Sequence, residues 1–113
     1  MKGKIMIVDD AADIRDLLAA ILRDTYEVSE AKSGADLKQA LTQSQPDVIL
    51  LDLKLPDADG LDLLPMVKKQ WSDTEVIVLT GNATFEAAVE ATKRGAYNSL
   101  NKPFDTQSLL VTV

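Results

Sequence analysis

Short apolar runs alternate with longer amphipathic segments along the chain. Three of these runs are uninterrupted and rich in branched aliphatic residues, at Ile5–Val8, Val48–Leu51 and Val76–Leu79. Such runs are typical of strands that are buried on both faces. Weaker patterns predict two more strands, at Tyr26–Val28 and Ala96–Leu100.

Between the strands, apolar residues recur every three or four positions, which is the spacing of amphipathic helices. The expected helices are Ala12–Arg23, a segment after Ser33 that ends before Pro46, Leu61–Trp71, Phe85–Val89 and a last helix from Phe104. Ser33 is a suitable N-cap for the second of them. Pro65 fits the helix Leu61–Trp71 only in its first turn or at a bend. Gly95 is typical of the residue that ends a helix.

Strands that alternate with helices at this spacing predict βαβ units, and therefore an α/β fold with a parallel sheet and helices on both faces. The length of 113 residues suits one domain with its own hydrophobic core. We expect residues 1–113 to form that domain. Its last helix is cut short by the chain end, so we expect the chain to be a piece of a longer protein.

The composition excludes several kinds of site. The chain has no Cys and no His, which removes disulfides, Cys/His zinc sites, thiol catalysis and triads that need an imidazole. A net charge of −6 without clustered Lys or Arg argues against nucleic-acid and anionic membrane surfaces as direct partners. No segment approaches the ~20 apolar residues of a membrane span and no signal peptide is recognisable, so we expect a cytoplasmic protein.

Polar side chains that can bind ligands or take part in a reaction follow four of the predicted strands. In open parallel sheets, ligands bind at the carboxyl ends of the strands. The residues at those ends are Asp9, Asp10, Asp52, Thr80 and Lys102. Crowded carboxylates repel one another unless a cation neutralises them, and Mg²⁺ prefers oxygen ligands of this kind. The sequence therefore predicts a magnesium site at this edge of the sheet.

The same residue types suit phosphoryl transfer. An aspartate can attack phosphorus as a nucleophile, and the charge on the phosphoryl oxygens then needs cations and hydrogen-bond donors such as Lys102 and Thr80. Each residue, taken alone, also has a structural explanation that needs no site. Asp9 or Asp10 would cap a helix, Asp52 would belong to a turn, Thr80 would be a loop residue and Lys102 a solvated charge. Their joint placement at one edge favours the site.

Four sequence segments together resemble the receiver domain of two-component response regulators, over essentially the whole chain. They are Ile5–Asp10, Leu50–Pro56 with Gly60, Thr80–Gly81 and Lys102–Phe104. The spacing D-x-x-x-P-x-x-x-G from Asp52 to Gly60, combined with the acidic pair and Lys102–Pro103, is highly specific. The resemblance implies a flavodoxin-like sheet with strand order 2-1-3-4-5.

The resemblance also implies a role for the carboxylates. Asp52 is the residue that a histidine kinase or a phosphotransfer protein would phosphorylate. Asp10 and Asp52 would ligate Mg²⁺ directly, Asp9 mainly through water, and the backbone carbonyl of Lys54 would complete the protein ligands.

Thr80 and Lys102 would hold the phosphoryl oxygens, with a cis bond between Lys102 and Pro103 that places the lysine. Most receivers carry an aromatic residue three positions before this lysine, and its inward turn accompanies the movement of the hydroxyl residue. Here that position is Ser99. Tyr97 lies two residues earlier, on the same face by strand alternation, and we predict that it carries the signal or that the signal is altered.

The expected protein is a switch that controls an output, most simply transcription, rather than an enzyme with an external substrate. Two alternatives are a docking module that is not phosphorylated and a small aspartyl-phosphate phosphatase of the haloacid-dehalogenase kind. The phosphatase needs a second acid two residues after the nucleophile, where this chain has Lys54. No glycine-rich loop supports nucleotide binding.

The segments Gly95–Asn98 and Lys102–Asp105 look most like receivers attached to sigma-54-dependent transcription activators. DNA binding would then belong to an output domain that is absent from this chain. The kinase, the stimulus and the surface of a homodimer cannot be deduced from the sequence.

Overall fold

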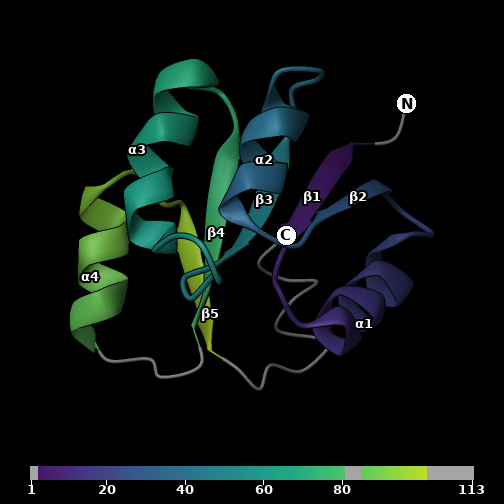
Figure 1. Ribbon diagram of the computed structural model, residues 1–113, viewed down its shortest axis with the longest axis horizontal. Coiled ribbons are helices and arrows are strands. Elements are labelled where there is room, and N and C mark those ends of the chain that lie inside the picture. The colour runs from purple at the N-terminus through teal and green to yellow at the C-terminus, as the bar shows by residue number, and fades with distance from the viewer. Residues whose placement is uncertain (1–2, 81–84, 102–113) are drawn as a thin grey trace.

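A computed structural model describes residues 3–80 and 85–101, and in this part of the chain five parallel strands form one sheet (Figure 1). The strands are β1 (Lys4–Val8), β2 (Glu27–Ala31), β3 (Val48–Asp52), β4 (Glu75–Thr80) and β5 (Asn98–Asn101). Their order is β2-β1-β3-β4-β5, so the expected 2-1-3-4-5 sheet is confirmed.

Two strands differ by two or more residues at one end from those expected, whereas the other three differ by at most one residue at each end. β2 continues to Ala31 because its backbone pairs with β1 through Val8, although its residues after Val28 are mostly polar and exposed. β5 begins at Asn98, two residues later than expected, and extends to Asn101, which pairs with Thr80. In both cases the pairing partner, and not the apolar pattern, determines where the strand lies.

Four helices lie in the described residues: α1 (Ala12–Leu22), α2 (Gly34–Leu41), α3 (Gly60–Gln70) and α4 (Phe85–Lys93). Ser33 caps α2 as expected, since its side chain accepts a hydrogen bond of 3.1 Å from the Asp36 amide. Pro65 lies in the second turn of α3, which excludes the first-turn alternative. Gly95 has φ of 109° after α4, a conformation that favours glycine. The last predicted helix, from Phe104, lies outside the described residues.

Side chains of the central strands alternate between two cores. Met6, Ile49 and Val76 belong to the core on the side of α2, α3 and α4. Ile5, Leu50 and Ile77 belong to the core on the side of α1. Figure 1 shows α1 apart from the other three helices. This alternation explains the uninterrupted apolar runs, since both faces of β1, β3 and β4 are covered. No helix among the described residues is long and apolar enough to cross a lipid bilayer.

Candidate magnesium and phosphoryl site

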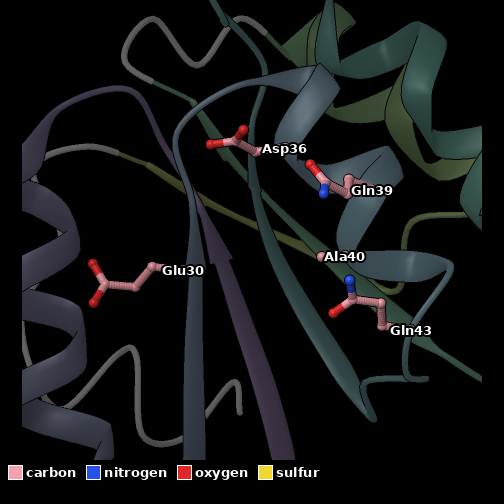
Figure 2. Close-up of a pocket in the computed structure, with 5 residues that line it drawn as sticks. All are labelled: Glu30, Asp36, Gln39, Ala40 and Gln43. Carbon is pink, nitrogen blue, oxygen red and sulfur yellow. The ribbon is translucent and has the colours of Figure 1, made fainter.

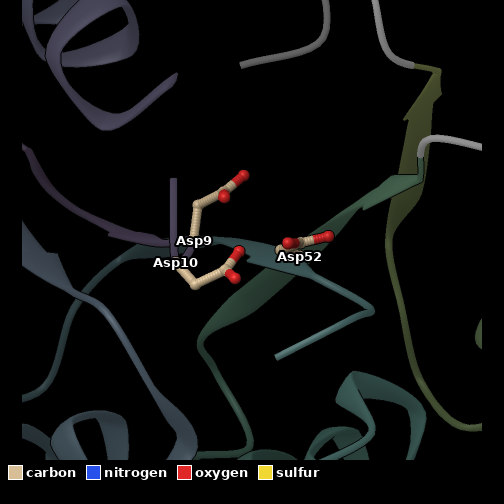
Figure 3. Close-up of side chains that lie close together, drawn as sticks. All are labelled: Asp9, Asp10 and Asp52. Carbon is tan, nitrogen blue, oxygen red and sulfur yellow. The ribbon is translucent and has the colours of Figure 1, made fainter. Parts of the chain in front are cut away.

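Three carboxylates meet at the carboxyl end of the central strands. Asp9 and Asp10 follow β1 directly, Asp52 ends β3, and one oxygen from each carboxylate lies within 4.8 Å of the others (Figure 3). Asp9 and Asp52 are buried, whereas Asp10 is exposed to solvent. The prediction that these three side chains come together is therefore confirmed. Three converging carboxylates, one of them from the exposed Asp10, fit Mg²⁺, which prefers oxygen ligands and keeps several of its waters.

Asp9 also has a structural role at the start of α1. Its side-chain oxygen Oδ1 accepts a hydrogen bond of 3.0 Å from the Ala11 amide, while the N-cap position of the helix is Ala11 itself. Neither Asp9 nor Asp10 occupies that N-cap position, so the ordinary reading of these residues as N-caps is wrong. The contact with Ala11 holds one oxygen of Asp9 in place.

The segment after Asp52 is a tight turn that depends on Gly60. The Gly60 amide donates to the Leu53 carbonyl at 2.8 Å, and Lys54 and Asp59 form an antiparallel bridge. A Cβ atom at Gly60 would lie 2.5 Å from the Asp52 carbonyl oxygen and 2.7 Å from the Leu53 Cα, so no other residue fits without movement of the backbone. The last position of the D-x-x-x-P-x-x-x-G pattern thus has a steric cause.

The Lys54 amide donates to Asp52 Oδ1 at 3.3 Å, which orients one oxygen of the acceptor carboxylate. Lys54 is otherwise an exposed residue in the bridge of this turn. Lys54 therefore lies beside the carboxylate cluster, and the role of its backbone carbonyl as a magnesium ligand stays a prediction.

Asp57, a residue that the sequence analysis did not single out, anchors this turn to α2. Its two carboxylate oxygens accept hydrogen bonds from the amides of Gly34 at 2.8 Å and Ala35 at 2.9 Å. These bonds hold the pKa of the Asp57 carboxyl below its usual value. A carboxylate also interacts favourably with the positive end of a helix. In the sequence Asp57 is one of several acids in a turn, which gives no signal for a contact with Gly34 and Ala35.

The remaining predicted residues lie partly outside the described chain. Thr80 ends β4 next to Leu79, and Leu79 is the register partner of Asp52, so Thr80 reaches the same edge of the sheet. Ser99 lies within β5 opposite Val78. Tyr97 precedes β5, and 64% of its surface is exposed. Lys102, together with Pro103, lies outside the described residues.

Apart from the carboxylate cluster, a hollow lies beside β2 and is lined by Glu30 from the strand and by residues in and just after α2 (Figure 2). The other lining residues are Asp36, Gln39, Ala40 and Gln43. The ionisable groups of this lining are both carboxylates, which offer no positive charge to a phosphate. The carboxylate cluster, and not this hollow, is therefore the candidate site.

The fold and the site define a class of protein: a doubly wound parallel α/β domain with an acidic cluster at the carboxyl ends of β1 and β3. The chain belongs to the response regulator receiver domain family, whose sequence profile matches residues 5–113. Members of this family are switches in two-component signalling, so the predicted family is confirmed.

The relatives include transcription regulators. The chain is 39% identical over 113 residues to the DNA-binding transcriptional regulator NtrC of Proteus hauseri, covering 99% of this chain and 24% of that protein. The crystal structure of NtrX from Brucella abortus is 38% identical, with a TM-score of 0.91, over 98% of this chain and 25% of that one. A CheY-like receiver protein from Methanospirillum hungatei is 31% identical with a TM-score of 0.93, and the match covers 98% and 90% of the two chains.

The chain spans about a quarter of the length of NtrC and NtrX. What it shares with them is the receiver domain, and the resemblance to receivers of transcription activators is confirmed to that extent.

Proposed function

We propose that Asp52 accepts a phosphoryl group from a histidine kinase or a phosphotransfer protein in a reaction that depends on Mg²⁺. The observation that carries this proposal is the convergence of three carboxylates within 4.8 Å. Asp10 and Asp52 would hold the ion directly, Asp9 through water, and the Lys54 carbonyl would add a further oxygen. When bound, Mg²⁺ supplies positive charge that offsets the carboxylates and the incoming phosphoryl oxygens.

In the proposed step, a carboxylate oxygen of Asp52 forms a bond to phosphorus. The bond between phosphorus and the donor nitrogen of phosphohistidine breaks, and its electron pair stays on that nitrogen. The Lys54 amide, which donates to Asp52 Oδ1 at 3.3 Å, orients the attacking group. Thr80 and Lys102 would bind the phosphoryl oxygens as charge spreads over them. Water later hydrolyses the acyl phosphate on Asp52. The chain would therefore act as a switch and not as an enzyme that turns over an external substrate.

The phosphoryl group adds charge and acceptor oxygens, which bias a domain between two conformations of similar energy. Thr80 would relay this change to the surface formed by α4 and β5. Tyr97 would take part in the relay, because Ser99 occupies the position where most receivers carry an aromatic residue. If Tyr97→Ala leaves the phosphorylation-dependent spectral changes at that surface intact, Tyr97 has no such role.

The output is transcription in the proposed whole protein, since one relative is a DNA-binding transcriptional regulator. We place that output in parts of the protein outside this chain, of the sigma-54-dependent activator type. The whole protein would act in the cytoplasm, and a homodimer is the assembly to test. This domain itself would contact neither nucleic acid nor membrane, in keeping with its net charge of −6.

The test is the intact mass of the chain after incubation with acetyl phosphate, with and without Mg²⁺. We expect a gain of one phosphoryl group that requires Mg²⁺, is abolished in Asp52→Asn and is retained in the control Asp24→Asn. No gain by a folded wild-type chain that binds Mg²⁺ would contradict the proposal and favour the docking module that is not phosphorylated.

A further inference from the structure

Arg15 joins three elements around the acidic pair, and the reaction described above gives it no role. It belongs to α1, and its side chain is 17% exposed. Its Nη1 donates to the backbone carbonyl oxygen of Asp9 at 2.7 Å. Its Nε lies 3.4 Å from Glu30 Oε1, and Figure 2 shows the Glu30 side chain extending from β2. A single guanidinium therefore bridges α1, the end of β1 and β2.

The bond to Asp9 acts on the peptide group that precedes Asp10. The Asp9 carbonyl belongs to the planar unit that links Asp9 to Asp10, so fixing this oxygen fixes the orientation of the whole unit. The Asp9 amide is held as well, since it donates to the Ala31 carbonyl at 3.1 Å. Asp10 is exposed and has less packing to restrain it than its buried neighbour. Its direction thus depends on the peptide that Arg15 holds.

We infer that Arg15 is a positioning residue for the Asp10 carboxylate, and that it raises the affinity of the site for Mg²⁺ by holding that ligand in place. The inference rests on the proposed function, because it assigns Arg15 to the same magnesium site. The planar guanidinium suits this role, since its donors point in fixed directions and reach a carbonyl and a carboxylate at once. The flexible ammonium group of lysine does not reproduce that geometry.

Charge alone predicts the opposite effect. A guanidinium near three carboxylates repels a divalent cation, so its removal would tighten Mg²⁺ binding if charge dominated. Loss of a group that orients a metal ligand typically lowers metal affinity by about 10-fold to 100-fold. The sign of the change in affinity therefore separates positioning from simple electrostatics.

The experiment is a calorimetric Mg²⁺ titration of the wild-type chain and of Arg15→Ala, Arg15→Lys and Arg23→Ala. Arg23 follows α1 and is exposed, so its variant matches the change in charge without touching the acidic pair. We expect about tenfold weaker binding in both Arg15 variants and no weakening in Arg23→Ala. Unchanged or tighter binding in Arg15→Ala, or full affinity in Arg15→Lys, would overturn the inference.

A double variant separates positioning from a general loss of structure. If Arg15 acts through Asp10, then Arg15→Ala adds little further weakening in an Asp10→Asn background, whereas a general structural effect persists there. Phosphorylation of the wild-type chain is measured in parallel. A wild-type chain that neither binds Mg²⁺ nor gains a phosphoryl group overturns the proposed function together with this inference. Normal wild-type behaviour with unaffected Arg15 variants overturns the inference alone.

Discussion

The two loops that bring the carboxylates together are held in different ways. The loop after β1 is short, and its backbone is held by groups from other elements: the Arg15 guanidinium and the Ala31 carbonyl. The turn after β3 is longer and is held largely by its own backbone, through the bonds from Gly60 to Leu53 and from Leu55 to Ala58. Its outer end is fixed by the Asp57 carboxylate on α2.

The two loops should therefore control different properties, metal binding for the loop after β1 and stability for the turn after β3. Side-chain contacts at a partly exposed site contribute little to folding, so changes around Arg15 should alter the metal site more than stability. Backbone atoms packed against Gly60 leave no room for adjustment, so changes there should alter stability first.

The largest effect is expected at Gly60. The added Cβ of Gly60→Ala would lie 2.5 Å from the Asp52 carbonyl oxygen, and overpacking of this kind destabilises by about 3 kcal/mol. Gly3→Ala is the control, because its Cβ would meet nothing closer than 3.4 Å. Urea unfolding measures both, and equal stability of the two variants would show that the turn tolerates a side chain.

The next effect changes sign with Mg²⁺. Without the ion, Asp10→Asn relieves repulsion among the carboxylates, and we expect a gain in stability of about 1 kcal/mol. With the ion at a hundred times its Kd, the wild-type chain gains about 2.7 kcal/mol, which the variant loses in large part. Thermal unfolding with and without chelator measures both. Asp16→Asn, an exposed acid of α1, is the control, and a variant that keeps the full Mg²⁺ gain would contradict a magnesium role for Asp10.

A smaller effect is expected at Asp57, and it depends on pH. Because folding lowers the pKa of Asp57 from 3.8, its ionised form stabilises the fold above that value, and this stabilisation is lost as pH falls through the lower, folded pKa. Asp57→Asn should therefore lower the urea midpoint at neutral pH, with a difference that disappears in acid. Asp24→Asn is the matched control, and a difference that stays constant across pH would contradict the charge-based anchor.

The smallest effect is expected at Glu30. Glu30→Gln removes the charge of the pair with Arg15, which is partly exposed, and should cost about 0.5 kcal/mol of stability. Glu27→Gln on the same strand is the control. A loss well above this, seen by urea unfolding, would mean that the first loop contributes to stability as much as the second and would remove the contrast between them.

The sequence was sufficient to predict the strands and carboxylates that form the site, but not the contacts that hold its loops in place. Apolar runs that end on Asp9 and Asp52 located two strands and, with the parallel sheet, predicted that the carboxylates meet. β2 could not be delimited, because its end is set by pairing with β1 and not by its own polar residues. Contacts such as that of Asp57 with Gly34 join residues far apart in the chain, and no local pattern records them.

The most direct test of the central claim identifies the phosphorylated residue itself. After incubation with acetyl phosphate and Mg²⁺, borohydride reduces an aspartyl phosphate to homoserine, which peptide mass spectrometry locates in the chain. The account predicts homoserine at position 52, and none in a sample prepared with chelator. Homoserine at position 9 or 10, or a phosphoryl group on a hydroxyl residue that resists reduction, would contradict it.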